Sequence, residues 1–414
     1  MTIRRNVTSR ASAAVALGAL LAAGCAGTAD NASAPARSSP SADPPHGYVE
    51  GARETAEQQS RLLLGDPSDG DVRILDLVTG SVHRSPRSAG LVRLSTDGRF
   101  GFLHTRDGVR VVDGGTWTVD HGDHVHYYRA AIRDVGDLPA DPDARIRGDA
   151  AVTAVTAPDG RARLVDRAAL EKGRTGAART LPGTHTGAVV PYAEHLVALV
   201  GGAGRPATAV VYDRAGERVA SPAGAECDAP GGDAVTGRGV VFGCADGALL
   251  VRRSKGAFTA EKIPYGRAVP AAERAAAFRQ RPGGDTLTAP AGERAVWVLD
   301  VTERSWRRIA TGPVVATGTA GEGSPLLVLE KDGTLNGYDI ATGKRISRTG
   351  KLLTGGYPAG PGGGGPVIEV DRSRAYVNDP RGRRVHEIDY NDGLRIARSF
   401  ELDIEPVLMA ETGR

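Results

Sequence analysis

The sequence has few of the features that mark a thiolate metal site or a membrane-spanning protein. Only three of its 414 residues are cysteines, and none belongs to a Cys-x-x-Cys unit of the kind found in thiolate zinc sites. After residue 24, no segment approaches the roughly 20 apolar residues that a spanning helix needs. These absences argue against a cysteine-based metal site and against a spanning domain in the main part of the chain.

The chain also lacks an excess of charge of either sign. Its formal net charge is +3 at pH 7, and Arg4, Arg5 and Arg10 supply three positive charges within residues 1–24, where there is no acid. Removal of that segment would leave a net charge of about zero. Nucleic-acid binding relies on a basic surface, so we expect no nucleic-acid partner.

Helical patterning is scarce as well. Only Pro270 to Gln280 has a helical composition. From about residue 60, short apolar or alternating runs are separated by glycine, aspartate, asparagine and proline, which is typical of strands and turns. We therefore predict one all-β domain over residues 60–414.

The N-terminus carries a secretory pattern. Arginines are followed by an apolar run from Ala11 to Ala23 and then by Gly24-Cys25. Residues 1–24 are therefore expected to be a signal peptide. A cysteine directly after a small-residue cleavage site resembles the lipobox of bacterial lipoproteins, although Leu21 lies one position further from Cys25 than usual. We expect a lipid anchor on Cys25 and a location on the extracytoplasmic face of the cell membrane. The alternative is a secreted protein in which Cys25 is incidental.

Residues 25–59 are expected to form a flexible linker after the lipidated cysteine. The stretch from Ala26 to Pro45 contains no aromatic or large aliphatic side chain and cannot bury a core. An exported protein can oxidise its other two cysteines, Cys227 and Cys244. Their spacing suits the two strands of one hairpin, so we expect a disulfide there. Two buried thiols are the alternative.

A weak repeat runs through the predicted β domain. Strand-like runs end in turns centred on an aspartate, as in Ile74-Leu75-Asp76-Leu77-Val78-Thr79-Gly80, and similar turns centre on Asp213, Asp300, Asp339 and Asp389. The aspartate can accept backbone N–H bonds, and glycine supplies positive φ. The spacings of 39 residues from Asp300 to Asp339 and 50 from Asp339 to Asp389 bracket one propeller blade. About 350 residues give seven to eight such units, and we predict a monomeric seven-bladed β-propeller. A pair of β-sandwiches is the alternative.

Histidine is concentrated at one place. Three of the nine histidines lie between Asp120 and Tyr128, where His121, His124 and His126 alternate with Asp123 and other residues. Imidazole and carboxylate together suit Zn²⁺ or a neighbouring transition metal better than Ca²⁺ or Mg²⁺. Strand periodicity places His124, His126 and Tyr128 on one face, with His121 and Asp123 on the preceding turn. A solvated loop without metal is the alternative interpretation.

A distant ligand would let such a site tie parts of the fold together. His185, between Gly183 and Gly187, is the candidate, because the glycines allow close approach. A turn histidine bonded to backbone is the alternative for His185. His104 is a weaker candidate. The remaining single histidines are expected to be structural, namely His46, His83, His195 and His386.

Residues 117–128, the His185 segment and the Cys227/Cys244 pair resemble the AztD-type periplasmic zinc metallochaperones, which are single propellers similar to the YncE-like family. The resemblance implies a protein that captures Zn²⁺ outside the cytoplasmic membrane and hands it to the solute-binding protein of a zinc ABC importer. Family members often carry a His- and Asp-rich flexible segment, whereas here only His46 precedes residue 60. One main metal site is therefore expected, without a histidine-rich capture arm.

Three functions remain open at the level of sequence. The first is the zinc carrier, which is not an enzyme. The second is a metal-dependent hydrolase or lactonase, in which three protein ligands and a water would create a nucleophile, and the coordination number separates it from the first. The third is a metal-free scaffold. A quinone-dependent propeller dehydrogenase is disfavoured, because that family repeats a tryptophan in each blade and this chain has three.

Overall fold

Strands make up nearly all of the regular structure in the described part of the chain, residues 47–121, 124–201, 205–357 and 365–414. The chain divides into units 1–45 and 46–414, and every described residue belongs to the second. Its helical elements are α1 (Arg167–Glu171) and the 3-10 turn η1 (Ala271–Glu273). No helix among the described residues is long and apolar enough to cross a bilayer. Only η1 forms within the helical composition at 270–280, since the chain is already extended at Arg274.

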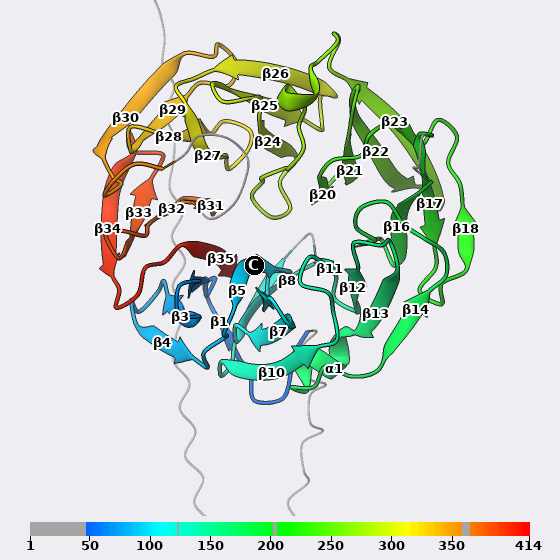
Figure 1. The fold of residues 1–414 in the computed structure, drawn as a ribbon, viewed down its shortest axis with the longest axis horizontal. Coiled ribbons are helices and arrows are strands. Elements are labelled where there is room, and N and C mark those ends of the chain that lie inside the picture. The colour runs from blue at the N-terminus through cyan, green and yellow to red at the C-terminus, as the bar shows by residue number, and fades with distance from the viewer. Residues whose placement is uncertain (1–46, 122–123, 202–204, 358–364) are drawn as a thin grey trace, which may run out of the picture. The chain divides into compact units, whose positions relative to one another are not determined.

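Eight antiparallel sheets follow one another around a ring in the described part of unit 46–414, and they form a β-propeller (Figure 1). Blades 1 and 2, from the inner to the outer strand, are β35 (Leu408–Thr412), β2 (Arg61–Asp66), β3 (Asp71–Asp76) and β4 (Val82–Ser85), then β5 (Leu91–Thr96), β6 (Phe100–Thr105), β7 (Gly108–Asp113) and β10 (Arg133–Leu138). Blades 3 and 4 are β11 (Arg145–Gly148), β12 (Val152–Thr156), β13 (Ala162–Asp166) and β14 (Ala178–Leu181), then β15 (Val190–Tyr192), β16 (His195–Val200), β17 (Ala207–Tyr212) and β18 (Arg218–Ala220), with β19 (Glu226–Cys227) also on β17.

The other four blades complete the ring. Blades 5 and 6 are β20 (Asp233–Thr236), β21 (Gly239–Cys244), β22 (Gly247–Ser254) and β23 (Ala257–Pro264), then β24 (Thr286–Pro290), β25 (Ala295–Asp300) and β26 (Ser305–Ala310). Blades 7 and 8 are β27 (Val314–Gly318), β28 (Leu326–Glu330), β29 (Thr334–Tyr338) and β30 (Arg345–Lys351), then β31 (Ile368–Val370), β32 (Ala375–Asp379), β33 (Arg384–Asp389) and β34 (Arg395–Glu401).

The propeller prediction is confirmed, but the number of blades among the described residues is eight rather than seven. Blade 1 is divided between the two ends of the domain, because β35 pairs with β2 and supplies the inner strand. Blade 6 has three strands, and an isolated bridge between Arg279 and Thr288 stands at its inner edge. The number of blades was predicted from turns repeated along the sequence. Such a count detects neither the divided blade 1 nor the three-stranded blade 6.

The aspartate turns lie where the repeat places them, before the outermost strand of a blade. Backbone N–H groups of Val78 and Thr79 donate to Oδ1 of Asp76, at 3.2 and 3.0 Å. The corresponding bonds to Asp213, Asp300, Asp339 and Asp389 are also present. Gly80 has a φ of +73°, which L side chains rarely adopt. The predicted turn chemistry is therefore confirmed.

The hydrophobic core lies between neighbouring blades. At the ring closure, Leu62, Leu64 and Leu75 of blade 1 pack against Tyr376 and Val385 of blade 8. Most outer strands are exposed, as β4, β30 and β34 show. Each blade therefore depends on its neighbours to cover its apolar faces, as in other ring-closed repeats.

A small sheet is inserted between the third and fourth strands of blade 2. It consists of β1 (Arg53–Thr55), β9 (Val125–Arg129) and β8 (Thr116–Asp120), in that order. β1 lies inside the segment 25–59 that we expected to be a flexible linker. That expectation is wrong for the end of the segment, because β1 forms a regular antiparallel pair with β9.

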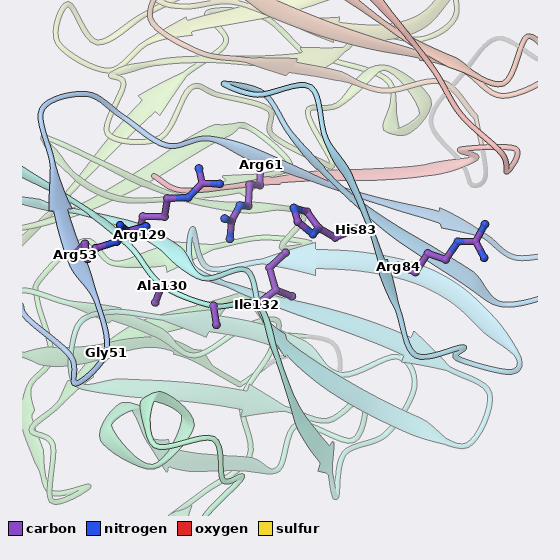
Figure 2. Close-up of a pocket in the computed structure, with 9 residues that line it drawn as sticks. Gly51, Arg53, Arg61, His83, Arg84, Arg129, Ala130 and Ile132 are labelled. Atoms are coloured by element: carbon purple, nitrogen blue, oxygen red, sulfur yellow. The ribbon is translucent and has the colours of Figure 1, made fainter.

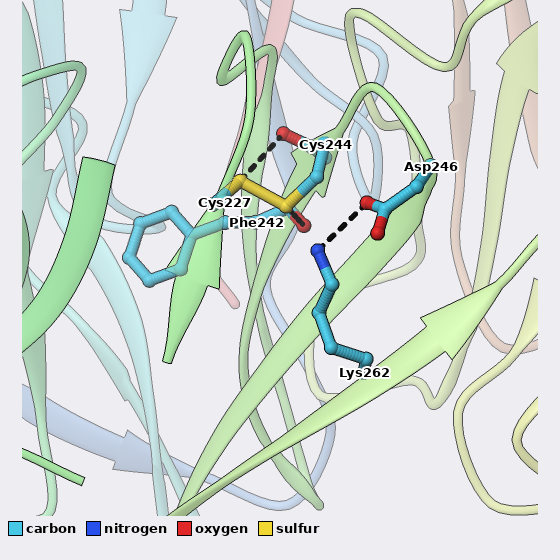
Figure 3. The surroundings of a disulfide bond; sticks show 6 residues. Cys227, Phe242, Cys244, Asp246 and Lys262 are labelled. Carbon is cyan, nitrogen blue, oxygen red and sulfur yellow. Dashed lines mark hydrogen bonds and ion pairs between the residues drawn. A yellow bond between two sulfur atoms is a disulfide. The ribbon is translucent and has the colours of Figure 1, made fainter. Parts of the chain in front are cut away.

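The predicted disulfide between Cys227 and Cys244 is present (Figure 3). Its expected position within one hairpin is wrong. Cys227 lies on β19, which pairs with β17 of blade 4, whereas Cys244 ends β21 of blade 5. The disulfide therefore joins two neighbouring blades, and the Cα atoms of the two cysteines are 5.2 Å apart.

Candidate metal centre

The small sheet is held to the propeller by aromatic and backbone contacts. The Trp117 ring stacks on Tyr128 with 5.4 Å between centroids, and the guanidinium of Arg99 lies 3.7 Å from the Trp117 ring. Arg99 is buried and paired with Asp113 at 3.0 Å. The Thr118 hydroxyl donates to the carbonyl of Gly413, directly after the closing strand β35. The sheet therefore has a fixed base on blade 2 and on the ring closure.

Three imidazoles meet at the outer end of this sheet. His121 follows β8, His124 precedes β9, and His126 lies within β9. One ligand atom from each ring lies within 4.8 Å of the others. The ring centroids of His124 and His126 are 4.9 Å apart, and those of His121 and His124 are 4.8 Å apart. The turn closes with a bond of 3.0 Å from the His121 N–H to the His124 carbonyl.

Glu54 of β1 contacts the same group of rings. Nδ1–H of His126 donates to Oε1 of Glu54 at 2.7 Å. In the β1–β9 register Glu54 faces Tyr128, so it lies on the same face of the sheet as His126, two residues away. A carboxylate on Nδ1 fixes the tautomer of His126 and leaves Nε2 available as a ligand. His126 and Tyr128 share a face, as strand periodicity predicted, with 6.2 Å between their centroids.

The group fits a small cation that prefers nitrogen ligands. Tetrahedral zinc with bonds of about 2.05 Å needs nitrogen atoms about 3.3 Å apart, so the rings would have to close by at most about 1.5 Å. His121 and His124 are exposed and His126 is half-buried, which leaves room for such rotations. Three imidazoles favour zinc and neighbouring transition metals over Ca²⁺ and Mg²⁺.

Two further ligands were expected, Asp123 and His185. Asp123 lies outside the described residues. His185 is buried at the start of blade 4, where it bridges to Val200, and its Nδ1–H donates to the Gly160 carbonyl at 3.1 Å. Burial lowers the pKa of His185, and the bond to Gly160 opposes that effect. The expectation of His185 as a remote ligand is therefore corrected to a packed histidine next to Tyr212, with 5.7 Å between ring centroids.

The other histidines that the structure describes lie elsewhere. His104 is buried in blade 2, with Nε2 2.9 Å from the Ser95 hydroxyl and Nδ1 2.9 Å from the Pro142 carbonyl. Burial, and next the charge of Arg93, lower its pKa to about 4. His386 is bonded to Ser399 and Leu352, and His195 to Ala193. His83 is exposed on β4, and His46 lies outside the described residues.

Sequence reasoning missed Glu54. The only local signal was the alternation of Arg53, Glu54 and Thr55, which is too short to identify a strand against the polar composition around it. The residue acquires its role only because β1 pairs with β9.

Similarity to known proteins is found at the level of structure. No family profile and no curated protein sequence matches the chain. AztD of Citrobacter koseri is 21% identical with a TM-score of 0.69, covering 86% of this chain and 98% of that one. Its apo form is 20% identical with the same TM-score and coverage. The dihydro-heme d1 dehydrogenase NirN is 17% identical with a TM-score of 0.53, covering 87% of this chain and 77% of that one. The expected likeness to AztD is thus confirmed for the fold.

Proposed function

We propose that this protein is an extracytoplasmic zinc carrier, which captures Zn²⁺ on His121, His124 and His126 and delivers it to the solute-binding protein of a zinc ABC importer. The observation that carries the proposal is the convergence of three imidazoles within 4.8 Å at the exposed end of a small sheet. The hydrogen bond from His126 to Glu54 supports it, because it prepares one ring for metal binding. An exposed site also suits a cation that must be released again.

Export and anchoring belong to the same proposal. A disulfide between Cys227 and Cys244 fits an oxidising compartment. The signal peptide 1–24 and acylation of Cys25 would hold the protein at the membrane, near an importer. Cys25→Ser should release the protein from the membrane fraction, and mass spectrometry of the N-terminal peptide should find the lipid on Cys25 of the unaltered protein.

Metal analysis tests the zinc site. Equilibrium dialysis with micromolar zinc should give about one Zn²⁺ per chain, and His124→Ala/His126→Ala should lose it. The matched control is His83→Ala/His195→Ala, which removes two imidazoles outside the group. Full zinc stoichiometry in the first variant would refute the proposal.

Delivery is tested by mixing the zinc-loaded protein with a solute-binding protein encoded by a neighbouring gene. Transfer through a complex should be faster than release to an excess of a chelator. Equal rates would mean that zinc simply dissociates, and would contradict a carrier that acts on its partner directly.

A metal-dependent hydrolase is the second candidate, and the count of ligands is what favours it. Three imidazoles on zinc leave a fourth position for a water, whose pKa the metal would lower. Zinc-dependent turnover of lactone or ester substrates that is lost in His124→Ala/His126→Ala would establish this function.

A further inference from the structure

A second feature of the small sheet lies on its other face. A cavity of about 560 Å³ is bordered by blade 1, by β1 and by the segment after β9 (Figure 2). Four arginines line it, Arg53, Arg61, Arg84 and Arg129, together with His83. None of the described residues that line it is acidic. The volume lies within the range of about 300–1,000 Å³ typical of small-molecule sites.

The cations of this cavity outnumber the carboxylates that neutralise them. The side chains of Arg61 and Arg129 are 4% and 25% exposed, and both pair with Asp76, at 3.2 and 2.7 Å. One carboxylate therefore balances two guanidinium groups. Burial, and next the charge of Arg129, lower the pKa of Arg61. The charge of Arg84 is balanced by another carboxylate, since Arg84 pairs with Asp403 at 3.0 Å. Its side chain extends away from the others in Figure 2.

Arg53 adds a further positive charge. It stands directly opposite Arg129 in the β1–β9 register, so the two side chains lie on one face of the sheet. Like charges in directly opposed positions destabilise a strand pair. Arg53 has no ion pair or hydrogen bond within the parts of the chain that the structure describes. An anion between Arg53, Arg129 and His83 would remove this repulsion.

We propose that this cavity binds a small organic or inorganic anion with at least two acidic groups, such as a polycarboxylate or a pyrophosphate. The paired guanidinium groups of Arg61 and Arg129 form the buried part of the site, and Arg53 and His83 close over the ligand from the exposed side. Guanidinium groups bind carboxylate and phosphate oxygens in a forked geometry, which favours such ligands over halide ions. The site is separate from the histidine group, because Glu54 and His126 lie on the opposite face of the sheet from Arg53 and Arg129.

Calorimetric titration with tricarballylate and with pyrophosphate tests the proposal. The full chain carrying His124→Ala/His126→Ala is used, so that an anion cannot be recruited by metal at the histidines. Binding of either probe is expected, and the stronger one identifies the ligand as carboxylate or phosphate. The affinity for the anion should fall as the sodium chloride concentration is raised, because salt screens the attraction between charges.

Two variants and a control locate the site. Arg53→Gln should weaken binding about tenfold, since it removes one charged hydrogen-bond donor. His83→Gln tests the other exposed side of the cavity in the same titration. Arg252→Gln is the control, because it removes an exposed arginine of β22 on the far side of the ring. The proposal is overturned if neither probe binds below about 10 mM, or if Arg252→Gln weakens binding as much as Arg53→Gln. If this anion proposal fails, the proposal that the histidines bind zinc is unaffected.

Discussion

Glu54 and His126 are joined by a hydrogen bond of 2.7 Å although they are 72 residues apart in the sequence. The bond links β1, which precedes the first blade, to β9, which is inserted in the second. β1 has only three residues, so its position depends on this contact and on its pairing with β9. The carboxylate is thus part of the candidate metal centre.

Replacement of Glu54 should weaken zinc binding without abolishing it. Glu54→Ala removes the acceptor that orients the His126 ring, and loss of such a partner typically lowers metal affinity tenfold to about a hundredfold. Glu54→Gln keeps an acceptor without the charge. Its zinc affinity should lie between those of Glu54→Ala and the unaltered protein. Competition with a fluorescent chelator measures the affinities.

The control for this series is Glu57→Ala, in which an exposed carboxylate three residues further on is removed from the same segment. Its zinc affinity should match that of the unaltered protein. If Glu54→Ala binds zinc as tightly as the control, the carboxylate has no part in the site.

His185 should be needed for stability rather than for zinc. It is buried, and its bond to the Gly160 carbonyl ties two neighbouring blades. His185→Ala should therefore lower the free energy of unfolding by about 1–3 kcal/mol through the lost bond and packing. Zinc stoichiometry should stay at that of the unaltered protein. A loss of zinc from a folded variant would restore His185 as a ligand.

Removal of the disulfide should destabilise the junction of blades 4 and 5. Cys227 and Cys244 are 17 residues apart, and closure of a loop of that length contributes about 3 kcal/mol in the chain-entropy account. Cys227→Ser/Cys244→Ser should lower the midpoint of urea unfolding. Reduction of the unaltered protein by dithiothreitol should have the same effect, and should have none on the variant.

His104 should make stability depend on pH below neutrality. Its pKa is about 4 in the folded protein because burial and Arg93 disfavour the charged form, whereas the unfolded chain has the ordinary value of 6.5. The unfolded state thus binds more protons between these values, so this contribution is complete above pH 6.5 and is lost as the pH falls towards 4. The difference corresponds to about 3 kcal/mol. His104→Gln should flatten that part of the stability profile in urea titrations at each pH, and an unchanged slope would contradict the assignment.

Much of the fold follows from local sequence chemistry. The aspartate turns recur because Asp76 and its equivalents accept backbone bonds in the same place in successive blades, and that bond needs only three or four neighbouring residues. The histidine group could be predicted for the same reason, since His121, His124 and His126 share one turn and one strand. The number of blades could not be predicted in this way, because the pairing of β35 with β2 joins residues more than 340 positions apart.

Long-range contacts also explain what was missed at the site. Cys227 was expected to face Cys244 across a hairpin, but β19 turns back to pair with β17 and places the disulfide between blades. Glu54 was hidden in a polar segment whose strand exists only beside β9. In each case the local residues permit several conformations, and pairing with a strand outside the local segment selects one.

The pairing of β35 with β2 also fixes an order of events during synthesis. The inner strand of blade 1 is made more than 340 residues after β2, so β2 must wait with one edge unpaired until residues 408–412 have emerged. Thr118 of the small sheet is bonded to Gly413, one residue beyond that strand, and therefore waits as well. The small sheet that carries the candidate metal centre should consequently gain its complete base only after residues 408–413 are in place.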